Sequence, residues 1–196
     1  AGNPVIIAGF GRVGQIIARI LRARKIGFTA LESNAEQVDF VRRFGSKTYY
    51  GDASRIELLR AAKAGQAKLF VLAIEDIEHS LRTAQTVRRH FPDLRIIARA
   101  RNRQHVYRLM DLGVGVINRD TYLSSLDMAG KVLQELGLSE DEATRSVRRF
   151  REHDEELLQR NYAFHDDEAK LADLAKRAAQ ELEELFEQDA REDSGR

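Results

Sequence analysis

Through the first 120 residues, short apolar runs alternate with longer segments whose apolar side chains recur every three or four positions. The run at 5–8 ends in glycines, as a strand buried on both faces does, and Ile16 and Ile20 mark the helical segment after it. This alternation predicts an α/β fold, a Rossmann-like doubly wound parallel sheet with right-handed crossovers. The predicted strands cover 5–8, 28–32, 47–50, 69–74, 95–100 and 114–117.

Residues that start or stop helices separate these runs. Gly45 should end a helix over 35–44, and Ser54-Arg55-Ile56-Glu57 is a capping-box pattern that should open the next helix. Further helices are expected over 76–91 and 104–112, which end at a proline and a glycine.

After residue 120 the strand pattern stops, and the chain becomes helical and highly charged. We expect a Rossmann nucleotide-binding domain over 4–120, a C-terminal helical extension for dimerisation or regulation over 121–190, and a disordered tail over 191–196. A second capping box begins at Ser139. The segment 169–186 has one apolar stripe, which must cover something: either its own domain, or a partner as a dimer arm.

The composition excludes several chemistries and favours one class of ligand. Cysteine is absent, which excludes disulfides, thiolate catalysis and thiolate-bound zinc. Residues 146–196 carry 9 Lys/Arg and 15 Asp/Glu, a net charge of −6, and the remaining residues carry 23 and 16, a net charge of +7. A basic first part suits anionic ligands. We expect no nucleic-acid partner, because the arginines are scattered and no nucleic-acid motif is present.

The strongest chemical motif is Gly9-Phe10-Gly11-Arg12-Val13-Gly14, a G-x-G-x-x-G sequence that follows a predicted strand and opens a predicted helix. Gly9 allows the tight turn, Gly11 clears space for a phosphate, and Gly14 permits close packing of the helix. Helix N–H groups then hold the phosphate. Glu32 should accept hydrogen bonds from ribose hydroxyls and repel a 2′-phosphate, which favours NAD or AMP over NADP. The alternative is a Rossmann-like fold with an empty site.

Other strand ends supply further candidate nucleotide contacts. Ser33 follows Glu32, and Asp52 with Ala53 ends the third strand, where Asp52 either contacts the base or caps the next turn. Ile74 and Glu75 follow the fourth strand. Arg99 and Arg101 flank the end of the fifth, and either meet phosphates or are solvated.

No catalytic or metal-ligating pattern accompanies this motif, and we expect a binding module, not an enzyme. A dehydrogenase needs a second region that supplies an acid or base beside the nicotinamide. The histidines form no triad-like or metal-binding pattern, and we expect each to be exposed at the surface. They are His79, His90, His105, His153 and His165.

Several motifs together resemble the KTN (RCK) domains that gate potassium channels and transporters, and in particular the cytoplasmic domain of the glutathione-gated potassium efflux systems, the Kef family. The resemblance covers almost all of residues 4–155. The motifs that resemble the family are the glycine motif with Glu32, Phe44-Gly45, Tyr50–Ala53, Ala73–Asp76, His90-Phe91-Pro92, Ile96–Arg101, Arg119–Tyr122 and Leu136-Gly137-Leu138.

The resemblance implies a homodimer, linked to a cation:proton antiporter-like membrane domain that this chain lacks, at the cytoplasmic face of the membrane. It implies a bound nucleotide, AMP or NAD(H). Glutathione holds such systems closed and bulky glutathione adducts open them, and an ancillary flavoprotein often binds the domain.

By position, the resemblance places glutathione contacts on Arg19, Arg119 and Asp154, with Phe44 near the adduct. Guanidinium groups bind carboxylates in a fork, as a peptide with free carboxylates requires. The best-known member of the family carries asparagine where Asp154 stands; an ionised aspartate cannot donate to a carboxylate, but it could meet the ammonium group of glutathione. Two alternatives remain: a KTN domain of another potassium transport system, and a small NAD-dependent reductase.

Overall fold

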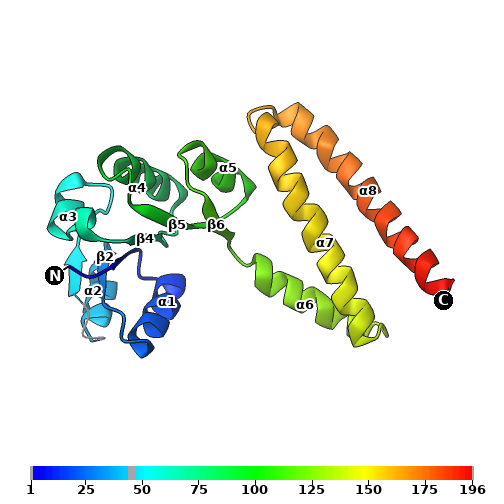
Figure 1. The fold of residues 1–196 in the computed structure, drawn as a ribbon, viewed down its shortest axis with the longest axis horizontal. Coiled ribbons are helices and arrows are strands. Elements are labelled where there is room, and N and C mark those ends of the chain that lie inside the picture. Colours follow the sequence, from blue (N-terminus) through cyan, green and yellow to red (C-terminus); the bar gives the residue numbers. More distant parts are fainter. Residues whose placement is uncertain (1, 44–46, 196) are drawn as a thin grey trace. The chain divides into compact units, whose positions relative to one another are not determined.

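The computed structural model describes residues 2–43 and 47–195. The chain divides into two compact units, Ala1–Asp120 and Thr121–Arg196 (Figure 1).

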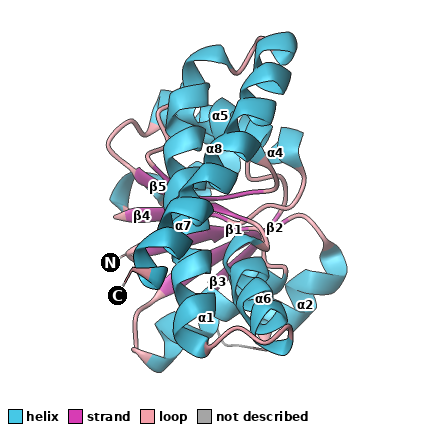
Figure 2. Cartoon of the chain, turned by 90° about the vertical axis from the view of Figure 1, so that its right-hand side faces the viewer, coloured by secondary structure: helices cyan, strands magenta, loops and turns pink. Residues whose placement is uncertain are grey.

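The first unit is built on a six-stranded sheet in which every described strand pair is parallel. Its strand order is β3-β2-β1-β4-β5-β6, so the direction of winding reverses between β1 and β4. This is the doubly wound Rossmann-like sheet that the alternating pattern predicted, and Figure 2 shows its strands in magenta. The strands are β1 Val5–Ala8, β2 Phe28–Glu32, β3 Lys47–Tyr50, β4 Leu69–Leu72, β5 Arg95–Ala100 and β6 Val116–Arg119.

Helices connect successive strands and cover both faces of the sheet. Figure 1 shows α1 and α2 on one side and α4 and α5 on the other, as right-handed crossovers require when the winding direction reverses. A short 3-10 helix, η1 Ala64–Gln66, follows α3. The helices are α1 Arg12–Ala23, α2 Ala35–Arg42, α3 Ile56–Ala61, α4 Ile77–His90 and α5 Arg103–Asp111.

Several element boundaries differ from the sequence expectations: strand β6 covers Val116–Arg119 where 114–117 was expected, and β4 ends at Leu72. Helix α2 ends at Arg42, and the expected end at Gly45 lies outside the described residues. The Ser54 capping box is wrong: Arg55 is the N-cap of α3, and the Ser54 hydroxyl instead donates to Asp52 Oδ1 at 2.7 Å. Ser54 therefore belongs to the turn after β3 and not to the helix.

The core forms where α1 packs on β1, and it fixes the glycine-rich turn. Phe10 is fully buried and stacks on Phe28, with ring centroids 6.3 Å apart. A Cβ on Gly14 would lie 2.2 Å from the Gly9 carbonyl oxygen, so only glycine allows α1 to approach this closely. The stacking of Phe10 on Phe28 and the close packing of α1 at Gly14 therefore fix the position of the turn.

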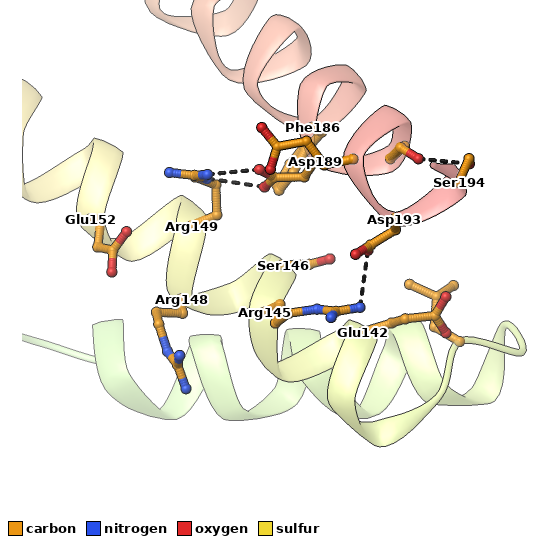
Figure 3. Close-up of a pocket in the computed structure, with 13 residues that line it drawn as sticks. Glu142, Arg145, Ser146, Arg148, Arg149, Glu152, Phe186, Asp189, Asp193 and Ser194 are labelled. Carbon is orange, nitrogen blue, oxygen red and sulfur yellow. Dashed lines mark hydrogen bonds and ion pairs between the residues drawn. The ribbon is translucent and has the colours of Figure 1, made fainter. Parts of the chain in front are cut away.

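The second unit consists of α6 Tyr122–Glu135, α7 Glu140–Asn161, η2 Tyr162–Phe164 and α8 Glu168–Ser194. The capping box at Ser139 is confirmed, with Glu142 as its partner. Helix α8 continues through most of the stretch expected to be a disordered tail. Near this end of α8, Arg149 and Arg145 of α7 pair with Asp189 and Asp193, at 2.7 and 3.1 Å (Figure 3). The apolar stripe of α8 is half-buried within this unit.

None of the helices in the described part of the chain is both long and apolar enough to span a membrane.

The expectation of exposed histidines is wrong for His105 and His153, which are 1% and 7% exposed. Nδ1 of His105 accepts from the Arg101 backbone N–H at 3.0 Å, so the ring proton lies on Nε2 and faces Ser80 Oγ at 3.1 Å. Protonation would place a second hydrogen against that N–H. Burial, together with the nearby Arg108 cation, lowers the pKa of His105 below its usual value.

We predict that the stability of the first unit falls as the pH drops through about 6.5. Below this pH the unfolded state binds a proton at His105 that the folded state refuses, so the free energy of unfolding decreases until the folded ring also titrates. The loss is about 1.4 kcal/mol for each unit by which the two pKa values differ. Urea unfolding at several pH values should show this slope.

The test variant is His105→Gln, and the matched control is His90→Gln. Glutamine offers the same acceptor and donor but does not titrate, so His105→Gln should flatten the slope. His90 is exposed at the end of α4, and its replacement should leave the slope unchanged. Equal slopes in all three proteins would contradict the assignment.

Candidate nucleotide-binding site

A cleft of about 230 Å³ opens at the carboxyl ends of β1 and β4, where the winding direction of the sheet reverses. Ligands of open α/β sheets bind at this switch point. Its lining comes from the ends of five strands, β1 to β5, and from the first turns of helices that follow them. The lining residues are Gly9, Phe10, Gly11, Arg12, Leu31, Glu32, Ser33, Asn34, Gln37, Gly51, Ala53, Ala73, Ile74, Glu75, Asp76, His79 and Arg99.

The glycine-rich turn forms one wall of this cleft, and its glycines have different roles. Gly9 has a φ of +90°, and a Cβ there would lie 2.7 Å from the Ala73 carbonyl carbon in the neighbouring β4 segment. A Cβ on Gly11 would meet nothing within 4 Å of it. Gly11 is also the N-cap of α1, whose cap makes no side-chain hydrogen bond. The turn thus combines open space with the positive end of a helix dipole, a combination that suits an anion.

Glu32 ties this turn to the next one. Its carboxylate is 7% exposed and accepts from the Phe10 N–H at 2.6 Å and from the Asn34 N–H at 2.9 Å. The bond to Phe10 spans 22 residues of the chain, and the two bonds together join the β1–α1 turn to the β2–α2 turn. A carboxylate has about four acceptor positions, so Glu32 retains capacity for ribose hydroxyls. No sequence motif indicated that Glu32 also holds these two turns together.

Arg99 lines the cleft, but its charge is already paired. Its Nε and Nη2 atoms donate to the two Asp120 carboxylate oxygens, each at 2.7 Å, in the fork geometry that arginine prefers. Arg101 similarly pairs with Glu75 at 3.0 Å. Both arginines therefore support the loops around the cleft. Arg12, which is exposed at the start of α1, provides a cation beside the glycine-rich turn.

Asp52 caps the turn after β3, one of its two expected roles. Its Oδ1 atom accepts from the Ser54 N–H at 2.8 Å and lies 2.7 Å from His79 Nε2. Burial pushes the pKa of Asp52 upward, but the hydrogen bonds from Ser54 and His79 outweigh it, and the pKa lies below its usual value. His79 also lines the cleft, so the expectation that it is merely a surface residue is wrong.

Three expected nucleotide contacts are absent from the cleft lining: Val13, Gly14 and Asp52. Val13 packs against the hydrophobic core, and Gly14 is buried in α1. Sequence reasoning missed several other lining residues, of which Asn34, Gln37 and His79 carry polar side chains. These residues could have been recognised from their positions, because they follow a strand end and lie at the start of the next helix.

The four expected glutathione contacts are distributed over the chain. Arg19 is exposed on α1, and Arg119 is half-buried at the end of β6. Asp154 is 4% exposed and belongs to the second unit. Phe44 lies outside the described residues.

Within residues 2–43 and 47–195, no group of three or more side chains is arranged to hold a metal ion.

The fold and its switch-point cleft define a Rossmann-class domain, and comparison with known proteins places that domain in a family. The family model of the TrkA-N domain matches residues 5–119, and that of the potassium efflux system KefB C-terminal domain matches residues 124–196. The chain therefore belongs to the Kef potassium efflux family, as its KTN (RCK) regulatory domain. The resemblance inferred from the motifs is confirmed.

Solved structures agree with this assignment. The Kef C-terminal domain of Shewanella denitrificans in its AMP-bound form is 37% identical, with a TM-score of 0.75, over 82% of this chain and 98% of that one. The TrkA-N domain of the inner membrane protein YbaL from Escherichia coli is 25% identical, with a TM-score of 0.60, over 70% and 98%. The GsuK channel bound to NAD, at 19% identity and a TM-score of 0.57 over 68% and 23%, shares the fold.

We predict that Glu32→Gln destabilises the protein even without a nucleotide. The amide can accept only one of the two backbone N–H groups, and its own NH₂ group faces the other donor. One unsatisfied buried donor costs about 1–3 kcal/mol. Chemical unfolding of the ligand-free protein measures this loss. Asp39→Asn removes the same charge at an exposed position on α2 and should cost little. Equal stability of the two variants would show that Glu32 does not brace the turn.

Proposed function

We propose that this regulatory domain binds AMP or NAD(H) in the switch-point cleft and responds to glutathione and its adducts, and so gates potassium efflux coupled to proton entry. The observation that carries the proposal is the open position at Gly11, at the N-terminus of α1 and inside the cleft. A phosphate placed there would accept from backbone N–H groups without displacing any side chain.

We propose that the residues lining this cleft hold the nucleotide. The ribose would meet Glu32 and Ser33, and the phosphate would meet the glycine-rich turn and Arg12. The full set is Gly9, Phe10, Gly11, Arg12, Glu32, Ser33, Ala53, Ile74, Glu75 and Arg99. Val13 and Gly14 would contribute only backbone N–H groups, and Asp52 would hold the turn that carries Ala53. The AMP in the Shewanella denitrificans relative supports this choice of ligand class.

Glutathione would bind through Arg19, Arg119 and Asp154, with Phe44 near a bulky substituent. The two guanidinium groups can each hold a carboxylate of the tripeptide, and Asp154 can meet its ammonium group. Glutathione and its adducts must favour different arrangements of a homodimer, because a ligand with equal affinity for both states gates nothing. The domain would act at the cytoplasmic face of the membrane, linked to an antiporter domain and assisted by a flavoprotein, and without catalysis of its own.

We predict that AMP and NAD bind to the purified chain and that Gly11→Ala weakens both by about tenfold or more, a loss of at least 1.4 kcal/mol. Gly11 has a φ of −75°, which alanine adopts freely, so the fold should survive. NADP should bind more weakly than NAD because its 2′-phosphate approaches the Glu32 carboxylate. Isothermal calorimetry measures all three ligands.

The control is Gly115→Ala, since a Cβ at Gly115 also meets nothing within 4 Å but lies outside the cleft. It should bind normally. Absence of AMP and NAD binding by the unmodified chain, or equal affinities in both variants, would refute nucleotide binding in this cleft.

We predict that glutathione and a bulky S-substituted glutathione compete for one site on the nucleotide-loaded protein. Arg119→Ala should weaken both by about tenfold, the usual effect of losing one charge-assisted pair. Arg89→Ala, at an exposed position on α4, is the control. Calorimetric titration that detects neither ligand would exclude glutathione gating, and a normal Arg119→Ala variant would favour a KTN domain with another effector.

A further inference from the structure

Two turns that precede β2 and β4, the strands on either side of β1, hold lysine in a left-handed backbone conformation. Lys25 follows α1 with a φ of 58°, and Lys63 follows α3 with a φ of 60°. Each lysine N–H bonds to the carbonyl three residues earlier, in Arg22 and Arg60. This position after a helix normally belongs to glycine, which adopts it without steric cost.

The same chain uses glycine for the same cap elsewhere. Gly113 follows α5 and Gly137 follows α6, with φ values of 76° and 102° and the same bond to the carbonyl three residues back. For a residue with a Cβ, the left-handed conformation costs about 1–2 kcal/mol. Strain of this kind, at two places on one edge of the sheet, points to a role for the side chains.

The two lysines belong to segments from which negative charge is missing. Residues 1–31 and 58–74 contain no aspartate or glutamate. Arg24 follows α1 beside Lys25, and Lys68 immediately precedes β4; both are exposed, as are the two lysines. In the parts of the chain that the structure describes, none of these four cations forms an ion pair. We call Arg24, Lys25, Lys63 and Lys68 the basic edge.

The N-terminal segment runs between the two halves of the basic edge. Asn3 donates to the Phe28 carbonyl at 2.8 Å, on the Lys25 side. The Lys68 N–H donates to the Pro4 carbonyl at 2.8 Å, and a Cβ on Gly2 would lie 3.7 Å from Lys63 Cδ. The strands β2, β1 and β4 are adjacent, so the basic edge spans about 10 Å.

The acidic residues at the amino ends of the strands lie beside β5 and β6, and not beside β2, β1 or β4. Asp93 precedes β5 and Asp111 ends α5, ahead of β6, so both lie on the side away from β2. The nucleotide cleft lies at the opposite, carboxyl ends of the strands. A ligand bound in that cleft therefore leaves the basic edge accessible.

We propose that the basic edge docks on an anionic membrane surface. The inference rests on the proposed function in one respect: the proposed link to a membrane antiporter domain would keep the first unit close to a bilayer. Lysines close to an anionic bilayer are attracted to its headgroups, and each adds to the affinity over a distance of about one Debye length. Their long side chains also let the charges reach the headgroups while the strands stay apart from them.

The helix dipole offers a competing explanation, since a cation near a helix C-terminus is favourable by itself. The two explanations differ in what Lys25→Gly with Lys63→Gly should do. If the lysines serve the membrane, glycine relieves strain, so the thermal midpoint rises while vesicle binding falls. If they serve their helices, the midpoint falls.

The experiment is co-sedimentation of the whole chain with vesicles of phosphatidylcholine, with and without phosphatidylglycerol. We expect binding only to the anionic vesicles, lost at about 1 M salt. The triple variant Lys25→Gln, Lys63→Gln, Lys68→Gln should bind these vesicles about tenfold less or weaker still. Lys131→Gln, Lys170→Gln, Lys176→Gln makes the same change in net charge outside the basic edge and should retain binding.

Three results would overturn the proposal: equal loss of binding in both triple variants, no binding to anionic vesicles by the unmodified chain, or a lower thermal midpoint in the double glycine variant. Tight binding to a DNA duplex that only the first triple abolishes would assign the edge to nucleic acid instead. AMP calorimetry on the same triple separates this proposal from nucleotide binding, because the cleft lies at the other end of the strands and should be unaffected.

Discussion

The buried Glu32 carboxylate is the interaction on which the cleft depends. It accepts from two backbone N–H groups that belong to different crossovers, Phe10 after β1 and Asn34 after β2. One carboxylate therefore links the two turns and helps to set their separation. Phe10 in turn is anchored in the core against Phe28, which fixes the turn against the sheet. The Gly11 position is thus shaped before a ligand arrives, and preorganisation of this kind reduces the entropy cost of binding.

The first unit was largely predictable because its signals are local. Apolar runs of strand length, glycines at their ends and helical periodicity between them specify the parallel sheet and place the Gly9–Gly14 turn at the switch point. The pairing of Arg99 with Asp120 was not predictable, since it joins β5 to the residue after β6, and no local pattern encodes it. His105 was misjudged for the same reason. Its buried ring contacts Ser80, 25 residues away in the chain.

The second unit is stabilised by different interactions. None of the residues of α8 is buried, and the helix is held to α7 partly by exposed ion pairs such as Arg149 with Asp189. Figure 3 shows these pairs bridging the two helices around a polar groove. Exposed pairs contribute little singly and weaken with salt. Charge complementarity across two helices is invisible to a hydrophobic-periodicity reading, which explains why the helix was expected to end before residue 191.

The most direct measurement of the central claim is the amide spectrum of isotopically labelled protein during titration with AMP. If phosphate lies over the glycine-rich turn, the N–H resonances of Gly11, Arg12 and Val13 should move furthest and saturate together with that of Phe10. Resonances of the second unit should stay in place. Movement confined to other elements, or a spectrum that AMP leaves unchanged, would contradict the account.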